Sequence, residues 1–245
     1  MSGASDPTEG VAPSTGPVLA IFAHPDDAEI AAGGTIASWA AAGRQVHLLV
    51  LTNGDRGSGD AARDRAELAR TRAAEQEAAA EVLGLASWRI LDVHDGDLEN
   101  TPAIRERVVR RIREVGAGTV VTLDPTAVFF EQRYYNHSDH RTAGWIALDA
   151  CFPGAGNPHF FAEHLAEGLE VCDVRDVWLG WTNEPNHVED VSEHFETAMA
   201  ALGCHASQLT EGIRYFQDML GSEAKEAGAT IGAVYGESFR VLDLA

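Results

Sequence analysis

Residues 18–34 read VLAIFAHPDDAEIAAGG, and the interpretation of the whole chain starts from this stretch. Its apolar beginning is typical of a strand that is covered on both faces of a parallel sheet. The run ends abruptly at His24, Pro25 and two adjacent acids, Asp26 and Asp27. Two explanations of these acids are open. They could cap a following helix, or they could join His24 in a compact set of nitrogen and oxygen donors, of the kind that zinc binds at about 2.0–2.2 Å.

Beyond this stretch the chain alternates short apolar runs with longer helical patterns. We predict strands at residues 18–23, 45–52, 87–93, 119–124, 174–182 and 238–244. We predict helices at residues 35–43, 60–83, 101–116, 140–152 and 192–209. The signals for helix ends include the N-caps Thr101 and Ser192 and the glycines Gly84 and Gly116. Strands that alternate with helices of this length indicate an α/β fold with a mainly parallel sheet and helices on both faces.

Charge and composition narrow the function classes. The net charge of −20 argues against nucleic acid or an anionic membrane surface as a partner, since both attract basic patches. No apolar run approaches the roughly eighteen residues of a membrane span. We expect one domain at 17–245, after a flexible tail at 1–16 that does not resemble a secretory signal. The cysteines are odd in number and form no CxxC pair, which favours a reduced, cytoplasmic setting.

A second polar cluster, His137, Asp139 and His140, follows the strand predicted at 119–124. Both clusters lie at the ends of predicted strands, where parallel sheets bind their ligands. One histidine of the cluster could ligate a metal while the other faces a substrate, and Asp139 is of the type that orients an imidazole ring. The alternative is a histidine-rich surface turn. Asn136 begins a glycosylation sequon, which we set aside because the chain shows no secretory signal.

Together the clusters supply enough donors for a catalytic zinc, which takes three protein ligands and keeps an open position. A dinucleotide-binding loop is not expected, because GxGxxG is absent after the first strand. The paired motifs AHPDDAE (23–29) and HSDH (137–140) resemble the zinc-dependent N-acetylglucosaminyl-phosphatidylinositol de-N-acetylase (LmbE-like) family, which commonly has proline in place of Ser138. Weaker matches follow in the family's order, at GGTIA (33–37), LTNGDRG (51–57), RAAEQEAAAEVLG (72–84), HDGDL (94–98) and HASQ (205–208).

The resemblance implies a Rossmann-like fold and a set of roles by position. The implied zinc ligands are His24, Asp27 and His140. Asp26 would be the general base that accepts a proton from the attacking water. A protonated His137 would stabilise the oxyanion or protonate the leaving amine, oriented by Asp139.

Further residues of the matching motifs have weaker assignments. The resemblance implies substrate contacts at Arg72 and Asp95, although a charged helix face and a plain Asp-Gly turn explain them equally well. Glu29 and His205 are left outside the metal shell. We expect Glu29 to face the helix dipole or to orient His24.

The leading hypothesis is therefore an amidohydrolase that uses Zn²⁺, with Fe²⁺ as the alternative ion. It would remove an N-acetyl or related acyl group from a small-molecule amino-sugar conjugate. Two rivals are a two-metal phosphoesterase and a metal-binding protein without catalysis. The clusters show one three-ligand set and no second, which disfavours the phosphoesterase. A protein that only binds metal would not need Asp26 or His137. A homo-oligomer remains an open alternative to a monomer.

Overall fold

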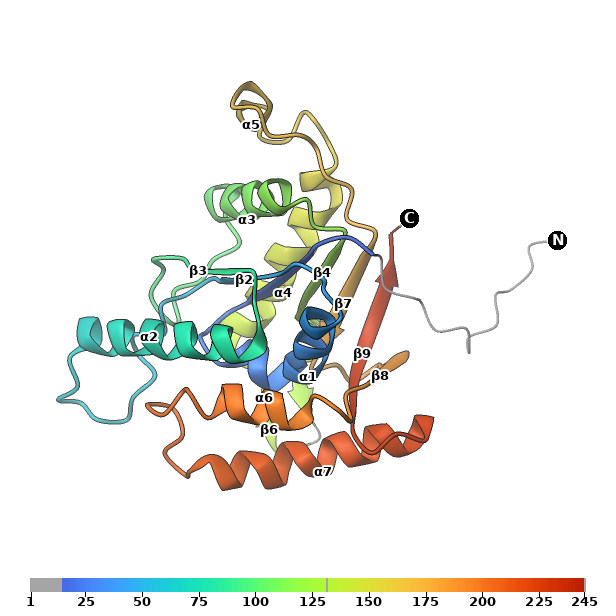
Figure 1. Ribbon diagram of the computed structural model, residues 1–245. Helices are drawn as coiled ribbons and strands as arrows, with labels where there is room; N and C mark the ends of the chain where they lie inside the picture. The colour runs from blue at the N-terminus through green and yellow to red at the C-terminus, as the bar shows by residue number, and fades with distance from the viewer. Residues whose placement is uncertain (1–14, 131, 245) are drawn as a thin grey trace.

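Figure 1 shows the computed structural model, which describes residues 15–130 and 132–244. Most of the tail predicted at 1–16 lies outside the described residues. The strands are β1 (Val18–Phe22), β2 (Val46–Val50), β3 (Ser87–Ile90), β4 (Thr119–Leu123), β5 (Phe129–Phe130), β6 (Tyr134–Tyr135), β7 (Asp176–Gly180), β8 (His187–Asp190) and β9 (Gly236–Asp243). The helices are α1 (Asp27–Ala41), α2 (Arg65–Leu83), α3 (Pro102–Val115), α4 (Ser138–Asp149), α5 (Glu163–Ala166), α6 (Phe195–Leu202) and α7 (Ile213–Ile231), with an irregular helical segment η1 (Ala150–Ala155).

Within the described residues, the main sheet has seven strands in the order β3-β2-β1-β4-β7-β9-β8. The first five in this order run parallel, and β9 and β8 complete the sheet in antiparallel pairing. The prediction of a mainly parallel sheet is confirmed. From β1 the chain moves outward to β2 and β3, and then returns to the other side of β1 to form β4. The carboxyl ends of β1 and β4 therefore flank the point where strand order reverses, which is where such sheets bind ligands.

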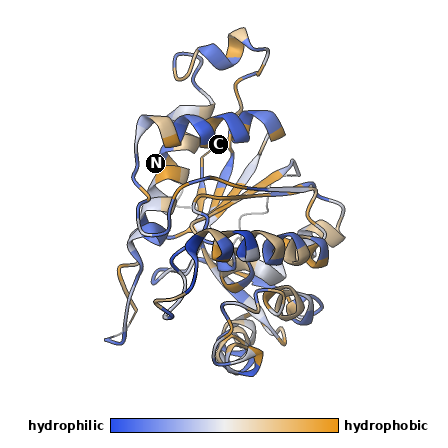
Figure 2. Ribbon diagram, turned by 90° about the vertical axis from the view of Figure 1, so that its left-hand side faces the viewer, coloured by the Kyte–Doolittle hydropathy of each residue, from blue (hydrophilic) through white to orange (hydrophobic). Residues whose placement is uncertain are grey.

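Helices cover both faces of the sheet, as predicted (Figure 1). The helices α3 and α4 lie on one face, whereas α1, α2 and α6 lie on the other, with α7 packed outside α6. The central strands between these layers, β1, β2 and β4, are mostly apolar (Figure 2). All five residues of β1 are buried, and they alternate between the two cores: Leu19 and Ile21 face one, whereas Val18, Ala20 and Phe22 face the other. In the part of the chain described, no helix combines the length and apolar character needed to cross a bilayer.

Several helix ends follow the sequence signals. The Thr101 hydroxyl accepts a hydrogen bond from the backbone N–H of Ile104 at the start of α3. Gly116 ends α3 and Gly84 ends α2, both with left-handed backbone dihedrals that glycine adopts at little cost.

The carboxyl-terminal third differs from the prediction. Ser192 does not cap a helix; its hydroxyl bonds to Asp190 and accepts N–H groups from the turn before β9, and α6 covers only Phe195–Leu202. The prediction also lacks α7, β8 and the β5–β6 hairpin. Glycines inside α7 resemble helix breakers, yet they allow close packing: a side chain at Gly228 would lie 2.9 Å from the backbone of Tyr235.

The contact between α4 and β4 sets the position of the second cluster, and it depends on a glycine. A Cβ at Gly144 would overlap the Leu123 carbonyl oxygen and would lie 2.8 Å from Cδ of Pro125. We expect Gly144→Ala to lower the free energy of unfolding by about 1–3 kcal/mol, because the helix must move off the strand. Gly59→Ala is the control, since no described atom lies within 4 Å of a Cβ there. Urea unfolding measures the free energy of unfolding of both variants. Equal values for Gly144→Ala and Gly59→Ala would contradict the prediction.

Candidate active site

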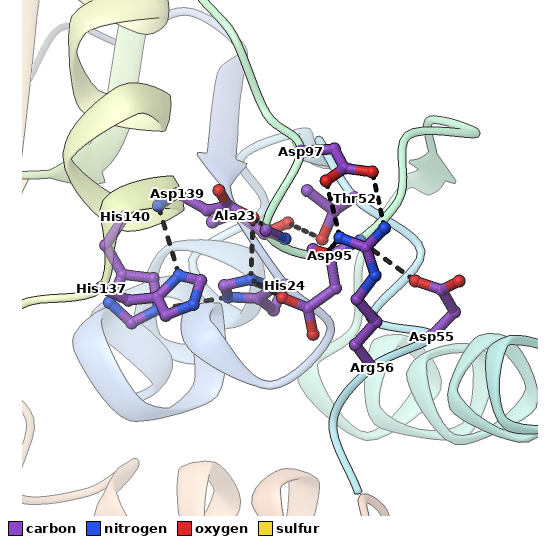
Figure 3. Close-up of polar contacts among 12 residues, drawn as sticks. Ala23, His24, Thr52, Asp55, Arg56, Asp95, Asp97, His137, Asp139 and His140 are labelled. Carbon is purple, nitrogen blue, oxygen red and sulfur yellow. Dashed lines mark hydrogen bonds and ion pairs between the residues drawn. The ribbon is translucent and has the colours of Figure 1, made fainter. Parts of the chain in front are cut away.

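The residues singled out from sequence meet at one edge of the sheet. His24 lies two residues after the end of β1, and Asp27 begins α1. The cluster after β4 lies at the start of α4, with His137 as its N-cap. Because β1, β2, β3, β4 and β7 run parallel, the loops after these strands all open at this edge. Figure 3 shows His24, His137 and His140 close together, with Asp95 beside His24.

The capping explanation for Asp26 is not supported. Asp26 precedes α1, but its side chain makes no capping hydrogen bond to a described residue. Its backbone has φ 110° and ψ −24°, a left-handed conformation that is unfavourable for a residue with a Cβ. Such strain persists where surrounding contacts over-determine it, and it is concentrated at functional sites.

Three side chains form a compact triangle of donors. His24 Nδ1 lies 3.2 Å from His140 Nε2 and 3.5 Å from Asp27 Oδ2, while Asp27 Oδ1 lies 3.2 Å from His140 Nε2. Tetrahedral zinc with bonds of roughly 2.0–2.2 Å places its ligand atoms about 3.3–3.6 Å apart. The separations of these donors therefore fit a metal of that size, with little rearrangement of the side chains.

Backbone and amide groups hold two of these donors. Asp27 Oδ2 accepts the backbone N–H groups of Ala23 (3.1 Å) and His24 (2.8 Å). His140 Nδ1 lies 2.9 Å from Asn136 Oδ1, and the Asn136 amide in turn donates to the Ala127 carbonyl oxygen. With its amide so fixed, Asn136 accepts the proton of His140 Nδ1 and leaves Nε2 free to ligate.

The sequence analysis missed this role of Asn136. The available signal was its position in the sequence, four residues before His140. Asn136 is fully buried, which also removes it as a surface glycosylation site.

The opposite nitrogen of His24 faces carboxylates. His24 Nε2 lies 3.2 Å from Asp95 Oδ1 and 3.4 Å from Asp139 Oδ2, which also accepts the Gly96 N–H at 2.6 Å. A carboxylate behind a ligating imidazole fixes its tautomer and raises its basicity. The Asp139 side chain thus orients His24, whereas the sequence analysis assigned it to His137. The backbone N–H of Asp139, not the carboxylate, bonds to His137 Nδ1.

The electrostatics of the cluster favour a positive charge at its centre. Burial alone would raise the pKa of Asp27, but His140 and His24 outweigh it and hold that pKa well below its usual range. Burial likewise opposes a charge on His24, yet Asp27, Asp139 and Asp95 raise its pKa well above the ordinary value. A cation bound between these side chains would satisfy the same acids. The donor types, the spacing and the charge therefore all fit a metal ion.

His137 stands beside the triangle, and ring nitrogens of His24, His137 and His140 lie within 4.8 Å of one another. Because His137 Nδ1 accepts the Asp139 backbone N–H, the ring proton of its neutral form is on Nε2. Burial lowers the pKa of His137, and His24 lowers it further. The ring is therefore suited to donate a hydrogen bond while neutral, which differs from the protonated ring assumed from the sequence.

Asp26 lies next to the triangle but contacts a different partner. Its Oδ2 is 3.3 Å from Arg72 Nη2, and its side chain is 16% exposed. Burial raises the pKa of Asp26 to about 6; Arg72 opposes this shift and Asp27 adds to it. Arg72 is itself buried and donates to the carbonyl oxygens of Pro25 (2.5 Å) and Gly54 (3.2 Å). Its guanidinium thus contacts Asp26 and the backbone, and the substrate contact expected from the sequence stays a prediction.

Asp95 keeps a position at the site, and a neighbouring turn holds it there. Asp55 accepts the Asp95 backbone N–H (3.1 Å) and lies 2.9 Å from His94 Nδ1. Arg56 binds both carboxylate oxygens of Asp97 and donates to the Asp95 carbonyl oxygen (Figure 3). The motif at residues 51–57 therefore shapes the loop that presents Asp95 to His24.

Comparison with known proteins places the chain in a family. Residues 19–151 match the GlcNAc-PI de-N-acetylase (PIG-L) family. The chain belongs to this family. It is 34% identical to a diacetylchitobiose deacetylase of Thermococcus kodakarensis, covering 91% of this chain and 82% of that protein. It is also 34% identical to a 1D-myo-inositol 2-acetamido-2-deoxy-alpha-D-glucopyranoside deacetylase of Rhodococcus erythropolis, covering 79% and 81%.

A solved structure of a family member is also similar to this chain. The N,N'-diacetylchitobiose deacetylase of Pyrococcus horikoshii, in complex with an inhibitor, superposes with a TM-score of 0.84 at 29% identity, covering 93% of this chain and 84% of that one. The Rossmann-like fold expected from the sequence is thereby confirmed. These relatives are deacetylases, which hydrolyse amide bonds, and the predicted family and reaction class are confirmed with them.

The role assigned to Asn136 can be tested by metal binding. We expect Asn136→Leu to weaken metal affinity about 10- to 100-fold, because His140 loses the acceptor that fixes its tautomer. Competition with a chelator, followed by metal content, measures this affinity. Asn157→Ala is the control, since that side chain caps a turn near α5. Unchanged affinity in Asn136→Leu would remove Asn136 from the site.

Proposed function

We propose that this protein is a metal-dependent deacetylase that removes the N-acetyl group of an N-acetylglucosamine-type conjugate. The observation that carries the proposal is the separation of roles at the sheet edge. Three donors, His24, Asp27 and His140, can hold an ion, while Asp26 and His137 stand beside them with no part in the triangle. A protein that only bound metal would have no use for a strained, largely buried carboxylate next to its ligands.

The proposed ion is Zn²⁺, with Fe²⁺ as the alternative. Two imidazole nitrogens and one carboxylate form a ligand set that zinc enzymes use, and this set keeps a coordination position open. The chemistry that such an ion supplies when bound is the activation of water and the polarisation of a carbonyl oxygen.

The chain's own groups would then move the protons. In this proposal an Asp26 carboxylate oxygen takes the proton of the attacking water, and Arg72 keeps that carboxylate in place. General base catalysis of this kind typically contributes about 100- to 10,000-fold in rate. Nε2–H of His137 donates to the oxygen on which negative charge develops, which requires no net charge on the ring. Asp26, having gained the proton, can pass it to the leaving amine.

An aromatic wall beside the metal triangle supports a sugar substrate. Trp181 follows β7 and packs edge-on against His140, with ring centroids 5.4 Å apart. Phe130 and Tyr134 extend the wall at 6.2 and 6.4 Å from Trp181. Trp181 has φ 50°, a strained conformation for a large residue, which the Thr182–Asp124 hydrogen bond at 2.6 Å helps to hold. Flat apolar rings suit the apolar face of a pyranose, and the two relatives above both act on 2-acetamido-2-deoxyglucose units.

We further propose a cytoplasmic setting and a small-molecule substrate. Within the residues that the structure describes, the cysteines Cys151, Cys172 and Cys204 form no disulfide, which is the usual state in a reducing compartment.

Acetate release tests the proposed reaction. Metal-reconstituted protein is incubated with N,N'-diacetylchitobiose, N-acetylglucosamine and an N-acetylglucosaminyl inositol. We expect acetate from at least one of them. Asp26→Asn should keep one equivalent of metal and lose about 100- to 10,000-fold in kcat, whereas His140→Ala should lose both metal and activity. Full activity of Asp26→Asn would contradict the role of Asp26 as general base. If the metal-loaded wild type releases no acetate, the proposed deacetylase activity is wrong.

The aromatic wall makes a separate prediction about substrate affinity. Trp181→Ala should raise KM about tenfold with a smaller effect on kcat, because the sugar ring loses an apolar contact surface. Phe152→Ala is the matched control, since this aromatic side chain is exposed in η1, at the far end of α4. Steady-state kinetics with the conjugate that the wild type hydrolyses fastest measure KM and kcat for both variants. A KM that does not change in Trp181→Ala would exclude stacking on this ring.

A further inference from the structure

The helix α1, which begins at the proposed metal ligand Asp27, is interrupted at Ala32. Ala32 has φ −156° and ψ 17°, which are not helical dihedrals, so α1 consists of two helical segments, residues 27–31 and 33–41. A helix that begins after Ala32 has free backbone N–H groups in its first turn, and the side chain of the preceding residue normally accepts them. Alanine offers no side-chain acceptor. The second segment therefore needs a cap from elsewhere in the chain.

Glu237 of β9 supplies this cap. Its Oε1 accepts the backbone N–H of Gly34 and its Oε2 accepts that of Thr35, each at 2.8 Å. These are the second and third N–H groups of the segment, which are the ones that a capping side chain usually reaches. A carboxylate at this position also faces the positive end of the helix dipole. A side chain of β9 thus completes a helix that lies beside β9 in space (Figure 1).

The two glycines at the start of the second segment allow this close approach. A Cβ at Gly34 would lie 3.0 Å from Glu237 Oε1 and 2.7 Å from Cβ of Val191. A Cβ at Gly33 would lie 2.9 Å from Cβ of Ala198 in α6. A side chain at either position would therefore push the segment away from the carboxylate or away from α6.

Glu29 lies in the first segment and anchors it to α2. Its side chain is 1% exposed, and its Oε1 accepts the Gln76 side-chain amide at 2.9 Å. Its Oε2 lies 3.5 Å from His205 Nε2. The expectation that Glu29 orients His24 is therefore wrong, because its carboxylate faces Gln76 and His205.

Both ends of the first segment also have close neighbours. At its start, the Asp27 carboxylate accepts two backbone N–H groups of the chain after β1. At its end, a Cβ at Gly180 would lie only 3.0 Å from the Ala31 carbonyl oxygen, so this segment packs tightly on the end of β7. The first segment is thus placed by β1, α2 and β7, whereas the second is placed by α6 and by Glu237. The break lets each segment keep its own neighbours.

The cap decides between a broken and a continuous helix. Without the Glu237 oxygens, the N–H groups of residues 34 and 35 would find their acceptors four residues earlier, in the carbonyl groups of residues 30 and 31. The two segments would then merge into one straight helix. The first segment would lose its fit against Gly180, and Asp27 would move with it.

We propose that Glu237 is a positioning residue for Asp27. Its carboxylate caps the second segment and so fixes the break at Ala32. The break in turn sets the direction in which the first segment presents Asp27 to the donor triangle. The inference rests on the proposed function, since it takes the donor triangle as a metal site.

Metal affinity in variants of position 237 tests the inference. We expect Glu237→Ala to weaken Zn²⁺ affinity about 3- to 30-fold, because the loss of a helix cap is felt at a ligand. Glu237→Gln keeps one acceptor oxygen and should lose less. The matched control is Glu189→Ala, because Glu189 lies opposite Glu237 in the β8–β9 ladder but contacts His187, at 2.9 Å. Its affinity should stay within about twofold of the wild type. Competition with a chelator, under conditions where urea unfolding shows every variant to be folded, measures these affinities.

A cap that only stabilises the fold would give a different result. In that case Glu237→Ala would unfold at lower urea concentration with unchanged metal affinity, which would overturn the proposal, as would an equal loss of affinity in Glu189→Ala. If Glu237→Ala does not fold, Glu237→Gln carries the same comparison.

Crystal structures of the metal-free wild type and variant give a readout that needs neither metal nor activity. We expect helical dihedrals at Ala32 in Glu237→Ala and an Asp27 carboxylate displaced from the N–H groups that follow β1. An unchanged break with Asp27 in its wild-type place would overturn the positioning role. A wild type that binds no metal or releases no acetate would instead contradict the proposed function, and the two crystal structures would still decide whether Glu237 positions Asp27.

Discussion

The Asp27 carboxylate joins the parts on which the site depends. One of its oxygens accepts the last backbone N–H groups of the β1 segment, at Ala23 and His24, and the carboxylate also reaches the rings of His24 and His140. A single side chain therefore fixes the strand end, the start of α1 and both histidines. It also explains why strand order matters, because only neighbouring strands could bring the loops after β1 and β4 into contact with it.

Buried charges of this density must be paired, and the pairing organises the surrounding loops. His24 stands between Asp27 on one side and Asp95 and Asp139 on the other, and Asp95 is in turn held by Asp55. An uncompensated carboxylate at this depth would cost several kcal/mol, so each acid needs its own donor. The loops after β2 and β3 thus serve the site even though they contribute no atom to the donor triangle.

Much of the fold and of the candidate site could be predicted from the sequence. The contacts of individual side chains could not. The strand ends, the mainly parallel sheet and the paired histidine-acid clusters depend on local patterns and were predicted. The partners of individual side chains depend on tertiary contacts. Nothing local shows that Asn136 would meet His140, that Asp139 would face His24, or that Arg72 would be buried against Asp26. The helix α7 was missed for a related reason, because its glycines matter only through the strand and helix they pack against.

The left-handed backbone of Asp26 solves a geometrical problem that two adjacent acids create. Asp27 points into the donor triangle, whereas Asp26, the proposed base, lies outside it and contacts Arg72. The dihedrals of Asp26, unusual for a residue with a Cβ, separate the two neighbouring carboxylates at a cost of about 1–3 kcal/mol. Glycine would relieve this strain but would remove the carboxylate. The contacts of α2 with the Pro25 carbonyl oxygen and with Asp26 itself therefore offset the strain where the chemistry requires it. If Asp26 is the base, as proposed, stability and catalysis are coupled at this one residue.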